Sequence, residues 1–312
     1  MPKTILITGA STGFGRDTAE TLARAGHTVF ASMRDLQTKN RDHADALRRR
    51  GIDVVELDVS SDASVDQGVK DVLARAEHID VLINNAGIAS AGVTEAFTPD
   101  QAKVVFNTNV VGLLRTIRAV LPGMRAQGDG LIINIGSIVG RVTFPFFGIY
   151  GASKFAVEAL TDSLRYEVSQ LGIDVALIQP SAYPTALFAK IQQPADADRA
   201  AAYGPTGDIP GAMFKNFAAM FQAADAPNPH DVAVAIAKLV AQPRGSRPAR
   251  TVVGAAFGAD TVNELTAPIQ AQAIEALGLG YLAKLAASKR ADSARPVPER
   301  LFAHASSTRR AL

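Results

Sequence analysis

The chain has 312 residues, of which 47% are hydrophobic and 20% charged, and its formal net charge is +2. This is the composition of a soluble globular protein with one large domain or two small ones, and it favours neither nucleic acid nor a membrane as a partner. The sequence contains no cysteine, which excludes disulfides, thiolate metal ligands and a cysteine nucleophile and suggests a reducing compartment. The start has no signal-peptide pattern and no apolar run approaches the ~20 residues of a membrane span, so we expect a cytoplasmic protein.

Residues 4–8 form a short apolar run that predicts a buried strand, followed by a glycine-rich turn and a helical pattern. The turn has the spacing Gly-x-x-x-Gly-x-Gly at Gly9, Gly13 and Gly15. Glycines let the backbone approach a pyrophosphate closely, and the start of the following helix offers unpaired N–H groups to phosphates. The segment predicts the opening of a dinucleotide-binding βαβ unit, with a turn that binds no ligand as the alternative.

The same turn also fits the nucleophile elbow of α/β-hydrolases, with Ser11 in the place of the nucleophile. A hydrolase needs a histidine further along the chain, and of the five histidines only His230 is suitably placed, at the start of a predicted helix. Because an elbow on the first strand would be unusual, we regard the hydrolase as the weaker alternative.

A second strand over residues 27–33 ends at Met33, Arg34 and Asp35. In dinucleotide folds an acidic residue at the end of this strand binds the ribose 2′-hydroxyl, whereas an arginine accommodates a 2′-phosphate. Met33 occupies the expected acidic position and Arg34 follows it. We therefore expect NADP(H) in preference to NAD(H), with a solvated surface arginine as the alternative reading of Arg34.

A third strand over residues 52–57 leads into Asp58, which either accepts from an adenine amino group or caps the helix predicted over residues 61–76. A fourth strand over residues 79–83 is followed by Asn84-Asn85-Ala86-Gly87. The two amides can tie neighbouring strands together, and the small residues leave room for a ligand over the backbone.

A long helical stretch over residues 99–125 contains Asn109, which is mildly unfavourable inside a helix and therefore needs a reason to be there. A fifth strand over residues 131–135 runs into Ser137, thirteen residues before Tyr150. Strand ends of this kind are where open α/β sheets bind their ligands.

The helix predicted over residues 147–171 carries Tyr150 and Lys154 on one face. A nearby cation favours the phenolate, so such a pair can give or take a proton at a substrate oxygen. Taken alone the spacing is weak evidence, because a solvated lysine beside a half-buried tyrosine is common. The loop before the helix holds aromatic residues at 144, 146 and 147, which either line an apolar pocket or pack in the core.

A sixth strand over residues 175–178, a helix over 231–242 and a strand over 251–254 complete the predicted sheet. Between them, Met213, Phe214, Phe217, Met220 and Phe221 follow helical spacing. This stripe is either ordinary core or a lid over an apolar substrate.

Seven strands alternating with helices predict an α/β fold of the doubly wound, Rossmann type, with a seven-stranded parallel sheet and helices on both faces. We expect a single dinucleotide-binding catalytic domain over residues 1–255 with a substrate lid at 186–228 inside it. Residues 256–312 form a helical C-terminal extension that ends in a polar tail from about Ser288.

This chain resembles the short-chain dehydrogenase/reductase family over roughly residues 3–255. The resemblance lies in the following residues: Thr8, Gly9, Gly13, Gly15, Asp58, Asn84-Asn85-Ala86-Gly87, Asn109, Ser137, Tyr150 and Lys154. Within the family, residues 30–36, 110–112 and 150–156 are similar to the 17β-hydroxysteroid and retinol dehydrogenase branch.

The resemblance implies that Tyr150 is the proton donor in reduction and the base in oxidation. Lys154 would lower the pKa of Tyr150 and hold the nicotinamide ribose, and Ser137 would bond the substrate oxygen. Asn109 would anchor a water that links Lys154 to solvent. No metal is implied, and the histidines form no cluster with metal-ligand spacing.

The resemblance also implies a set of cofactor contacts. They are Gly9, Ser11, Gly13, Phe14, Gly15, Arg34, Asp58, Val59, Asn85, Ala86, Gly87, Tyr150, Lys154, Pro180, Tyr183 and Thr185. Two positions depart from the family, because Ser181 replaces its usual glycine and Tyr183 its usual small aliphatic residue. We expect both side chains to narrow the site near the nicotinamide.

Together these features predict an NADP(H)-dependent oxidoreductase that transfers hydride between the nicotinamide and a small apolar alcohol or ketone. The alternative is a sensor or scaffold protein that binds NADP(H) without catalysis. The resemblance also implies a homodimer or homotetramer in which the helices over 99–125 and 147–171 pair across a symmetry axis.

Overall fold

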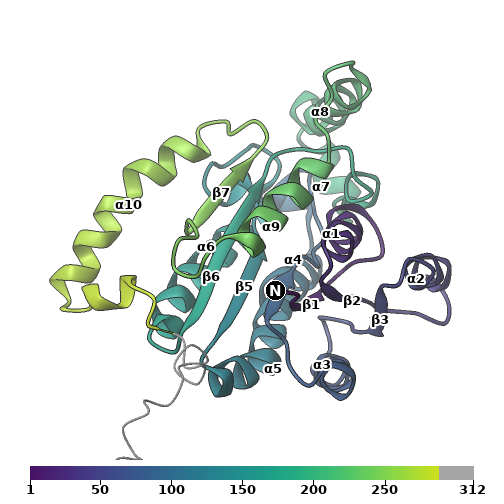
Figure 1. Ribbon diagram of the computed structural model, residues 1–312. Coiled ribbons are helices and arrows are strands. Elements are labelled where there is room, and N and C mark those ends of the chain that lie inside the picture. The colour runs from purple at the N-terminus through teal and green to yellow at the C-terminus, as the bar shows by residue number, and fades with distance from the viewer. Residues whose placement is uncertain (288–312) are drawn as a thin grey trace, which may run out of the picture.

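Seven parallel strands form one sheet in the order β3-β2-β1-β4-β5-β6-β7, seen in a computed structural model that describes residues 1–287 (Figure 1). The strands are β1 (Thr4–Ile7), β2 (Thr28–Met33), β3 (Asp53–Glu56), β4 (Val81–Asn84), β5 (Gly130–Ile135), β6 (Ile173–Pro180) and β7 (Arg250–Val253). The strand order reverses between β1 and β4, which is the point where open sheets bind nucleotides. The predicted doubly wound fold is confirmed, while the predicted tail from Ser288 lies outside the described residues.

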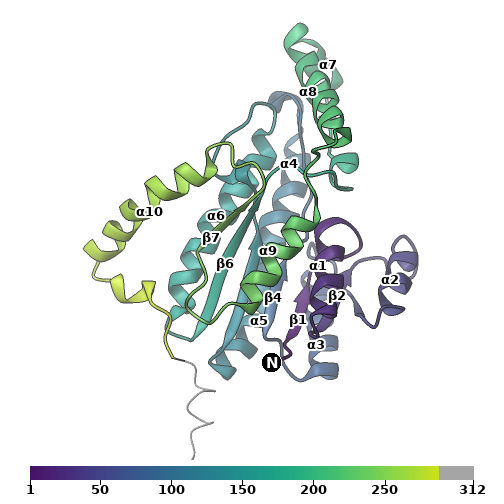
Figure 2. The ribbon, with the colours of Figure 1, turned by 45° about the horizontal axis from the view of Figure 1, so that its top comes forward.

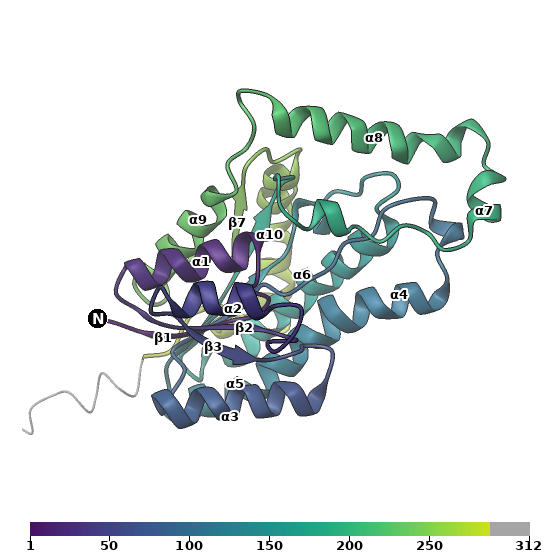
Figure 3. The same cartoon turned by 90° about the vertical axis from the view of Figure 1, so that its right-hand side faces the viewer.

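Helices cover both faces of the sheet (Figures 1 and 3). One face carries α1 (Gly13–Arg24), α2 (Arg41–Arg48) and α9 (His230–Ala241); the other carries α3 (Asp62–Ala76), α5 (Gly112–Gln127) and α6 (Gly148–Ser169). Successive residues of β1 alternate between the two resulting cores: Ile5 and Ile7 pack with α1 and α9, and Leu6 packs with α3 and α5. Because both faces are buried, β1 is apolar throughout.

The helical stretch before β5 is not uniform. It consists of α4 (Pro99–Phe106), which starts with a capping box between Thr98 and Gln101, a π-helical turn η2 (Asn107–Val111), and α5. By length and composition alone the whole stretch Pro99–Gln127 could cross a membrane. In the fold, its side chains at 113, 117 and 120 pack in the core beneath the sheet.

Buried amides and hydroxyls connect the middle of the sheet to two helices. Thr116 on α5 donates to Asn84 Oδ1 (2.6 Å), and Asn84 Nδ2 donates to Asn134 Oδ1 (2.9 Å). Asn134 Nδ2 in turn donates to Thr161 Oγ1 on α6 (2.9 Å). These hydrogen bonds run from α5 through β4 and β5 to α6. They confirm that Asn84, which lies at the end of β4, ties neighbouring strands together.

The segment 186–228 contains η4 (Phe188–Lys190), α7 (Ala197–Ala201) and α8 (Pro205–Gln222). In Figure 3, α8 runs across the top of the molecule between α7 and α9, apart from the sheet. Its only buried residue is Pro210, and none of its side chains belongs to the core clusters. The apolar stripe predicted on this helix is therefore not ordinary core.

Polar contacts attach the start of this segment to the body of the protein. Glu95, on the short helix η1 (Thr94–Ala96), bonds Arg199 Nη1 (2.8 Å) and the hydroxyl of Tyr203 (2.9 Å). Gln192 exchanges backbone bonds with Ala89 and Ala91 beside β4. These contacts fix residues 192–203 against the body. Helix α8 contacts the body through side chains such as Phe217.

The C-terminal extension lies outside both helical layers (Figure 2). It comprises α10 (Ala259–Ala276) beside the edge strand β7 and η5 (Gly280–Ala283) against α6. Gln170 at the end of α6 donates to the carbonyls of Tyr281 (3.2 Å) and Lys284 (2.8 Å). Of α10 itself only Ala259 is buried.

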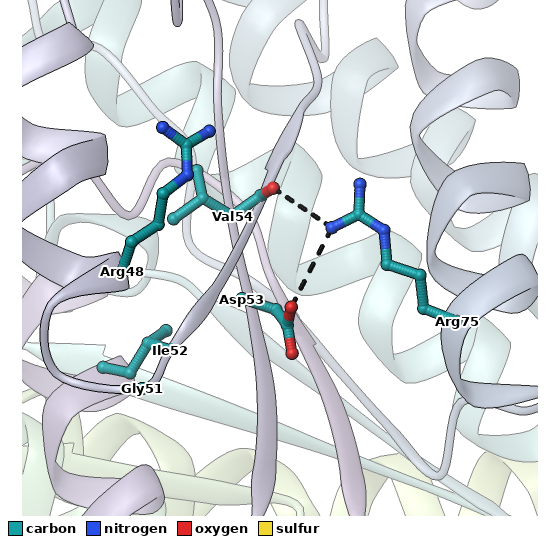
Figure 4. Close-up of a pocket in the computed structure, with 6 residues that line it drawn as sticks. All are labelled: Arg48, Gly51, Ile52, Asp53, Val54 and Arg75. Atoms are coloured by element: carbon teal, nitrogen blue, oxygen red, sulfur yellow. Dashed lines mark hydrogen bonds and ion pairs between the residues drawn. The ribbon is translucent and has the colours of Figure 1, made fainter.

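A pocket opens between α2, β3 and α3, at the start of β3 (Figure 4). Its floor is polar, because Arg75 reaches the carbonyl of Val54 (3.5 Å) and Asp53 (3.9 Å). The carboxyl ends of the strands, where the predicted site residues lie, are at the opposite edge of the sheet. This pocket is therefore separate from the predicted site.

Candidate active site

Helix α6 brings Tyr150 and Lys154 together at the carboxyl end of β5. Lys154 is 7% exposed, its ammonium donates to the carbonyl of Ile135 (2.8 Å), and it lies 5.8 Å from the centroid of the Tyr150 ring. The predicted spacing of one helical turn thus places both side chains in one site, with the lysine buried and the tyrosine half-buried. The contact with Ile135 was not predicted from the sequence, because any residue type can supply the backbone carbonyl that accepts from Lys154.

Ser137 follows β5 in an extended conformation and starts the short helix η3 (Ile138–Gly140). Its hydroxyl accepts from the N–H of Val139 (3.3 Å), lies 3.5 Å from the carbonyl of Pro180, and is hydrogen-bonded to the phenol of Tyr150. The structure therefore brings three of the four predicted catalytic side chains together.

Asn109 lies in the π-helical turn and connects the segment after β4 to α6. Its Oδ1 accepts from the N–H of Ile88 (2.9 Å), and its Nδ2 donates to the carbonyl of Ile88 (2.9 Å) and to Ser153 Oγ (3.0 Å). Ser153 in turn donates to the carbonyl of Tyr150 (2.7 Å). These bonds explain the asparagine inside a helical stretch, because the turn widens where its amide reaches out. Its predicted role in holding a water stays a prediction.

Burial determines the protonation of the pair. It raises the pKa of Tyr150 to about 12, against a smaller lowering by the hydrogen bond with Ser137. It lowers the pKa of Lys154 to about 8, against the opposing charge of Glu158. The loss of solvent around the phenolate therefore dominates the shift. The prediction that Lys154 lowers the pKa of the phenol stays a prediction.

The glycine-rich turn between β1 and α1 leaves no room for a side chain at Gly9 or Gly15. Gly9 has a φ of +66°, and a Cβ there would lie 2.7 Å from Ala86 Cα. A Cβ on Gly15 would lie 2.4 Å from Asn85 Nδ2, which donates to the carbonyls of Thr8 and Gly9. Asn85 thereby holds the turn against the end of β4.

The start of α1 has the features of a phosphate site. It has no side-chain cap and no acidic residue in its first turn, so its N–H groups remain available to an anion. Gly13 has a φ of +57°, and a Cβ there would lie 3.7 Å from Thr185 Cβ. Gly87 opens the other end, since a Cβ there would lie 3.3 Å from Asn109 Oδ1 and 3.9 Å from Lys154 Nζ. The residues present therefore fit a dinucleotide.

Arg34 and Asp58 face each other at the ends of β2 and β3. The guanidinium is 57% exposed and lies 3.7 Å from Asp58 and 3.8 Å from Asp35. Burial acts to raise the pKa of Asp58, but hydrogen bonds from Ser60 and the charge of Arg34 hold it below its usual range. The cap of α3 is Ser61, so the alternative that Asp58 caps this helix is wrong.

Three of the predicted cofactor residues turn their side chains into the core. The Tyr183 side chain is 1% exposed and packs edge-on against Phe14, with ring centroids 5.6 Å apart. Val59 packs with Leu57. The expectation that the Tyr183 ring narrows the site is therefore wrong, because the ring points towards α1 and α9. Gly254 makes room for it, since a Cβ there would lie 2.7 Å from the Tyr183 hydroxyl.

His230, the histidine of the hydrolase alternative, is paired elsewhere. Its Nδ1 lies 2.9 Å from Asp17 Oδ2, in a contact between α9 and α1. Within residues 1–287, no hydrogen bond joins His230 to Ser11. The hydrolase interpretation of the glycine-rich turn therefore lacks its histidine, which leaves the dinucleotide-binding interpretation.

A row of aromatic rings extends from Tyr150 into the segment 186–228. Phe147 lies 6.4 Å from Tyr150 and 6.5 Å from Phe217, between ring centroids. Phe188 lies 5.5 Å from Phe217 and 4.9 Å from Phe221. We call these four phenylalanines the aromatic wall. Phe144 instead contacts Phe257, next to the C-terminal extension.

A doubly wound sheet with a glycine-rich turn at its switch point, and with a half-buried tyrosine next to a buried lysine beside it, is typical of a nucleotide-binding oxidoreductase. The family model for short chain dehydrogenases matches residues 3–196, and this chain belongs to that family.

Two curated relatives match the same region. The chain is 40% identical over 184 residues to 3-ketodihydrosphingosine reductase of Bacteroides thetaiotaomicron. The matched region covers 59% of this chain and 65% of the relative. It is 37% identical over 195 residues to human retinol dehydrogenase 8, which covers 61% and 62%. The chain therefore matches less than two thirds of the length of either relative. The expected likeness to the retinol dehydrogenase branch is confirmed.

Solved structures share almost the whole fold. A short-chain dehydrogenase from Streptomyces avermitilis has a TM-score of 0.71 at 30% identity, covering 90% of this chain and 98% of the other. A Burkholderia phymatum family member in complex with NAD has a TM-score of 0.69 at 26% identity (86% and 95% covered). An actinorhodin polyketide ketoreductase variant with NADPH has a TM-score of 0.68 at 28% identity (83% and 97% covered). These structures support a nicotinamide cofactor.

Proposed function

We propose that this protein is an NADP(H)-dependent oxidoreductase that interconverts an apolar alcohol and the corresponding ketone or aldehyde. One observation carries the proposal: Ser137, Tyr150 and Lys154 converge beside the phosphate cradle and next to the aromatic wall. When bound, the nicotinamide supplies or receives the hydride. The protein supplies the proton, the position of the substrate and the charge around its oxygen.

In reduction, the Tyr150 phenol donates its proton to the carbonyl oxygen, and burial keeps that proton in place until then. The hydroxyl of Ser137 donates a hydrogen bond to the same oxygen and so stabilises the negative charge that develops there. The Lys154 ammonium stabilises the phenolate that remains. In oxidation the phenolate accepts the alcohol proton, and the same groups act in reverse.

The preference for NADP(H) rests on Arg34. Its guanidinium is exposed at the end of β2, where the 2′ position of the adenosine ribose is bound in this fold. A planar guanidinium suits a phosphate through paired hydrogen bonds. Similar structures hold NADPH or NAD, so the fold alone does not decide between the two cofactors. Arg34 is the residue that favours NADP(H).

The preference for an apolar substrate rests on the aromatic wall, which continues directly from Tyr150. The names of the two curated relatives denote a reductase of 3-ketodihydrosphingosine and a dehydrogenase of retinol, both largely hydrocarbon molecules. A long apolar chain beside the carbonyl would lie along the phenylalanines and displace water from them.

The test is NADPH oxidation by the purified protein with a panel of apolar ketones and aldehydes. Tyr150→Phe should lower kcat by about 10²-fold or more, because the proton donor is lost. Tyr166→Phe, on the same helix and outside the site, is the matched control and should keep full activity. Full turnover in Tyr150→Phe would refute the mechanism, and NADPH binding without turnover of any substrate would favour a sensor or scaffold.

A further inference from the structure

Helix α6 carries a buried carboxylate one turn beyond the catalytic lysine. Glu158 follows Lys154 at i+4, so it shares the face that bears Tyr150 and Lys154. It is only 3% exposed. A buried charge requires partners, and the partners of Glu158 come from outside α6.

Both carboxylate oxygens of Glu158 accept from a fixed donor. Gln179 Nε2 on β6 donates to Oε1 (2.5 Å), and Arg250 Nε on β7 donates to Oε2 (2.8 Å). The guanidinium of Arg250 also bonds Asp162, one further turn along α6. Burial raises the pKa of Glu158, and the bonds from Arg250 and Gln179 oppose that shift and favour the carboxylate.

The C-terminal extension completes this arrangement. Asn263 Nδ2 on α10 donates to Gln179 Oε1 (2.7 Å), which turns the amide N–H of Gln179 towards Glu158. Gln179 is fully buried, so no solvent molecule replaces this orienting bond. One other polar contact joins α10 to the body: Arg141 donates to the hydroxyl of Thr266. Among the described residues, α10 makes few further polar contacts with the body. Residues 259–276 also lie beyond the 3–196 region that the family model matches.

Glu158 is packed closely under the site. A Cβ on Gly140, in the helix that follows Ser137, would lie 2.9 Å from the carbonyl oxygen of Lys154 and 3.2 Å from Glu158 Cγ. The charged groups that face Glu158 are Lys154 and Asp162 from α6, Arg250 from β7, and Arg141 after η3. The negative charge of Glu158 opposes the effect of burial on Lys154 and so favours the ammonium.

We propose that Glu158 is a positioning residue for the Tyr150–Lys154 pair, and that α10 holds it in place through Asn263 and Gln179. The carboxylate keeps the lysine charged and fixes the turn of α6 on which it stands. The inference rests on the proposed function, in which Lys154 acts as a cation beside the nicotinamide ribose and the phenol.

The experiment compares wild type with Glu158→Gln, Glu158→Asp and Asn263→Ala in two titrations between pH 6 and pH 10. The first follows NADPH affinity by fluorescence, and the second follows kcat for reduction. In Glu158→Gln the alkaline midpoint of both titrations should move down by about one pH unit, because the charge that favours the ammonium is gone. Glu158→Asp keeps the charge and should keep the midpoint.

Asn263→Ala should move the midpoint in the same direction by a smaller amount. An unchanged midpoint in Glu158→Gln, with kcat lowered equally at every pH, would show a merely structural role and overturn the proposal. If Glu158→Gln does not fold, the test uses Asn263→Ala, which lies on the exposed helix α10. An unchanged alkaline midpoint in Asn263→Ala would then refute the inference. A wild type that binds NADPH but reduces nothing would refute the proposed function, whereas the NADPH titration would still decide the role of Glu158.

Discussion

The ring centroids of Phe147 and Phe217 lie 6.5 Å apart, which joins the start of α6 to the exposed helix α8. Phe147 also contacts Tyr150, so one ring connects the side chain of Tyr150 with the segment 186–228. Because α8 contributes nothing to the core clusters, its place over the site depends on this contact and its neighbours. The fit of an apolar substrate should therefore depend on Phe217.

We expect Phe217→Ala to raise KM for long apolar ketones by roughly 2- to 10-fold, because an aromatic contact contributes about 0.5–1.5 kcal/mol. KM for a short ketone should change little. Met220→Ala is the control, since Met220 lies on the same helix and is 37% exposed. Steady-state kinetics with a series of increasing chain length measures the effect, and an equal change for all chain lengths would contradict a role in substrate contact.

Reduction should slow as the pH rises through about 8. Lys154 has a pKa lowered to about 8 by burial, so its ammonium is present below that pH and lost above it. Tyr150, whose pKa is raised to about 12, keeps its proton across this range and does not limit the reaction. A pH profile of kcat for reduction measures the midpoint, and a rate that stays constant to pH 10 would show that the charge on Lys154 is not needed.

Arg34→Ala should weaken NADPH binding by roughly 10- to 100-fold, since a charge-assisted hydrogen bond contributes about 1.5–3 kcal/mol. NADH binding should be unchanged, because NADH has no 2′-phosphate. Arg48→Ala is the control, since Arg48 lines the pocket at the opposite edge of the sheet. Fluorescence titration gives both dissociation constants, and equal losses for the two cofactors would contradict a phosphate contact.

Gly140→Ala should lower the stability of the protein by about 1–3 kcal/mol, because the new methyl group meets the backbone of Lys154 at 2.9 Å. It should also lower kcat by displacing Ser137 from Tyr150. Gly123→Ala is the matched control: nothing lies within 4 Å of its Cβ, and alanine in a helix should stabilise by about 0.5–1 kcal/mol. Thermal melting of both variants tests the prediction, which a gain in melting temperature for Gly140→Ala would contradict.

We also predict a homo-oligomer formed through the two long helical stretches. Exposed large apolar residues gather there: Val104, Val111 and Leu114 on the stretch 99–127, and Phe155 on α6. The double variant Leu114→Glu/Phe155→Glu should elute as a monomer in size-exclusion chromatography. Leu265→Glu on α10 is the control, and a monomer from the control alone would place the interface on the C-terminal extension.

Much of the sheet could be predicted because β1, β4 and β5 are short apolar runs, and polar residues stand at or after the carboxyl ends of β4 and β5. Asn84 and Ser137 each mark the carboxyl end of a strand, where parallel sheets collect their ligands. The spacing of Tyr150 and Lys154 likewise determines their shared face once the segment is helical. These features follow from local periodicity, which the sequence carries directly.

What could not be predicted depends on the direction of side chains outside regular elements. Tyr183 lies after β6 in a segment without periodicity, so nothing in the sequence tells that its ring turns to Phe14. The pKa of Tyr150 depends on how much solvent the folded protein removes, which residue types do not report. The partners of Glu158 come from β6 and β7, and only the tertiary structure brings them together.

The hydrogen bonds between amides and hydroxyls of α5, β4, β5 and α6 also determine where Tyr150 stands. Sliding α6 along β5 by one residue would turn Thr161 away from Asn134 and strand buried polar groups, at about 1–3 kcal/mol for each. Apolar contacts alone tolerate several alignments, but these directional bonds select a single one. Tyr150 stands about three turns earlier on the same helix. The position of Tyr150 along the sheet therefore depends on Thr161, which lies outside the group formed by Ser137, Tyr150 and Lys154.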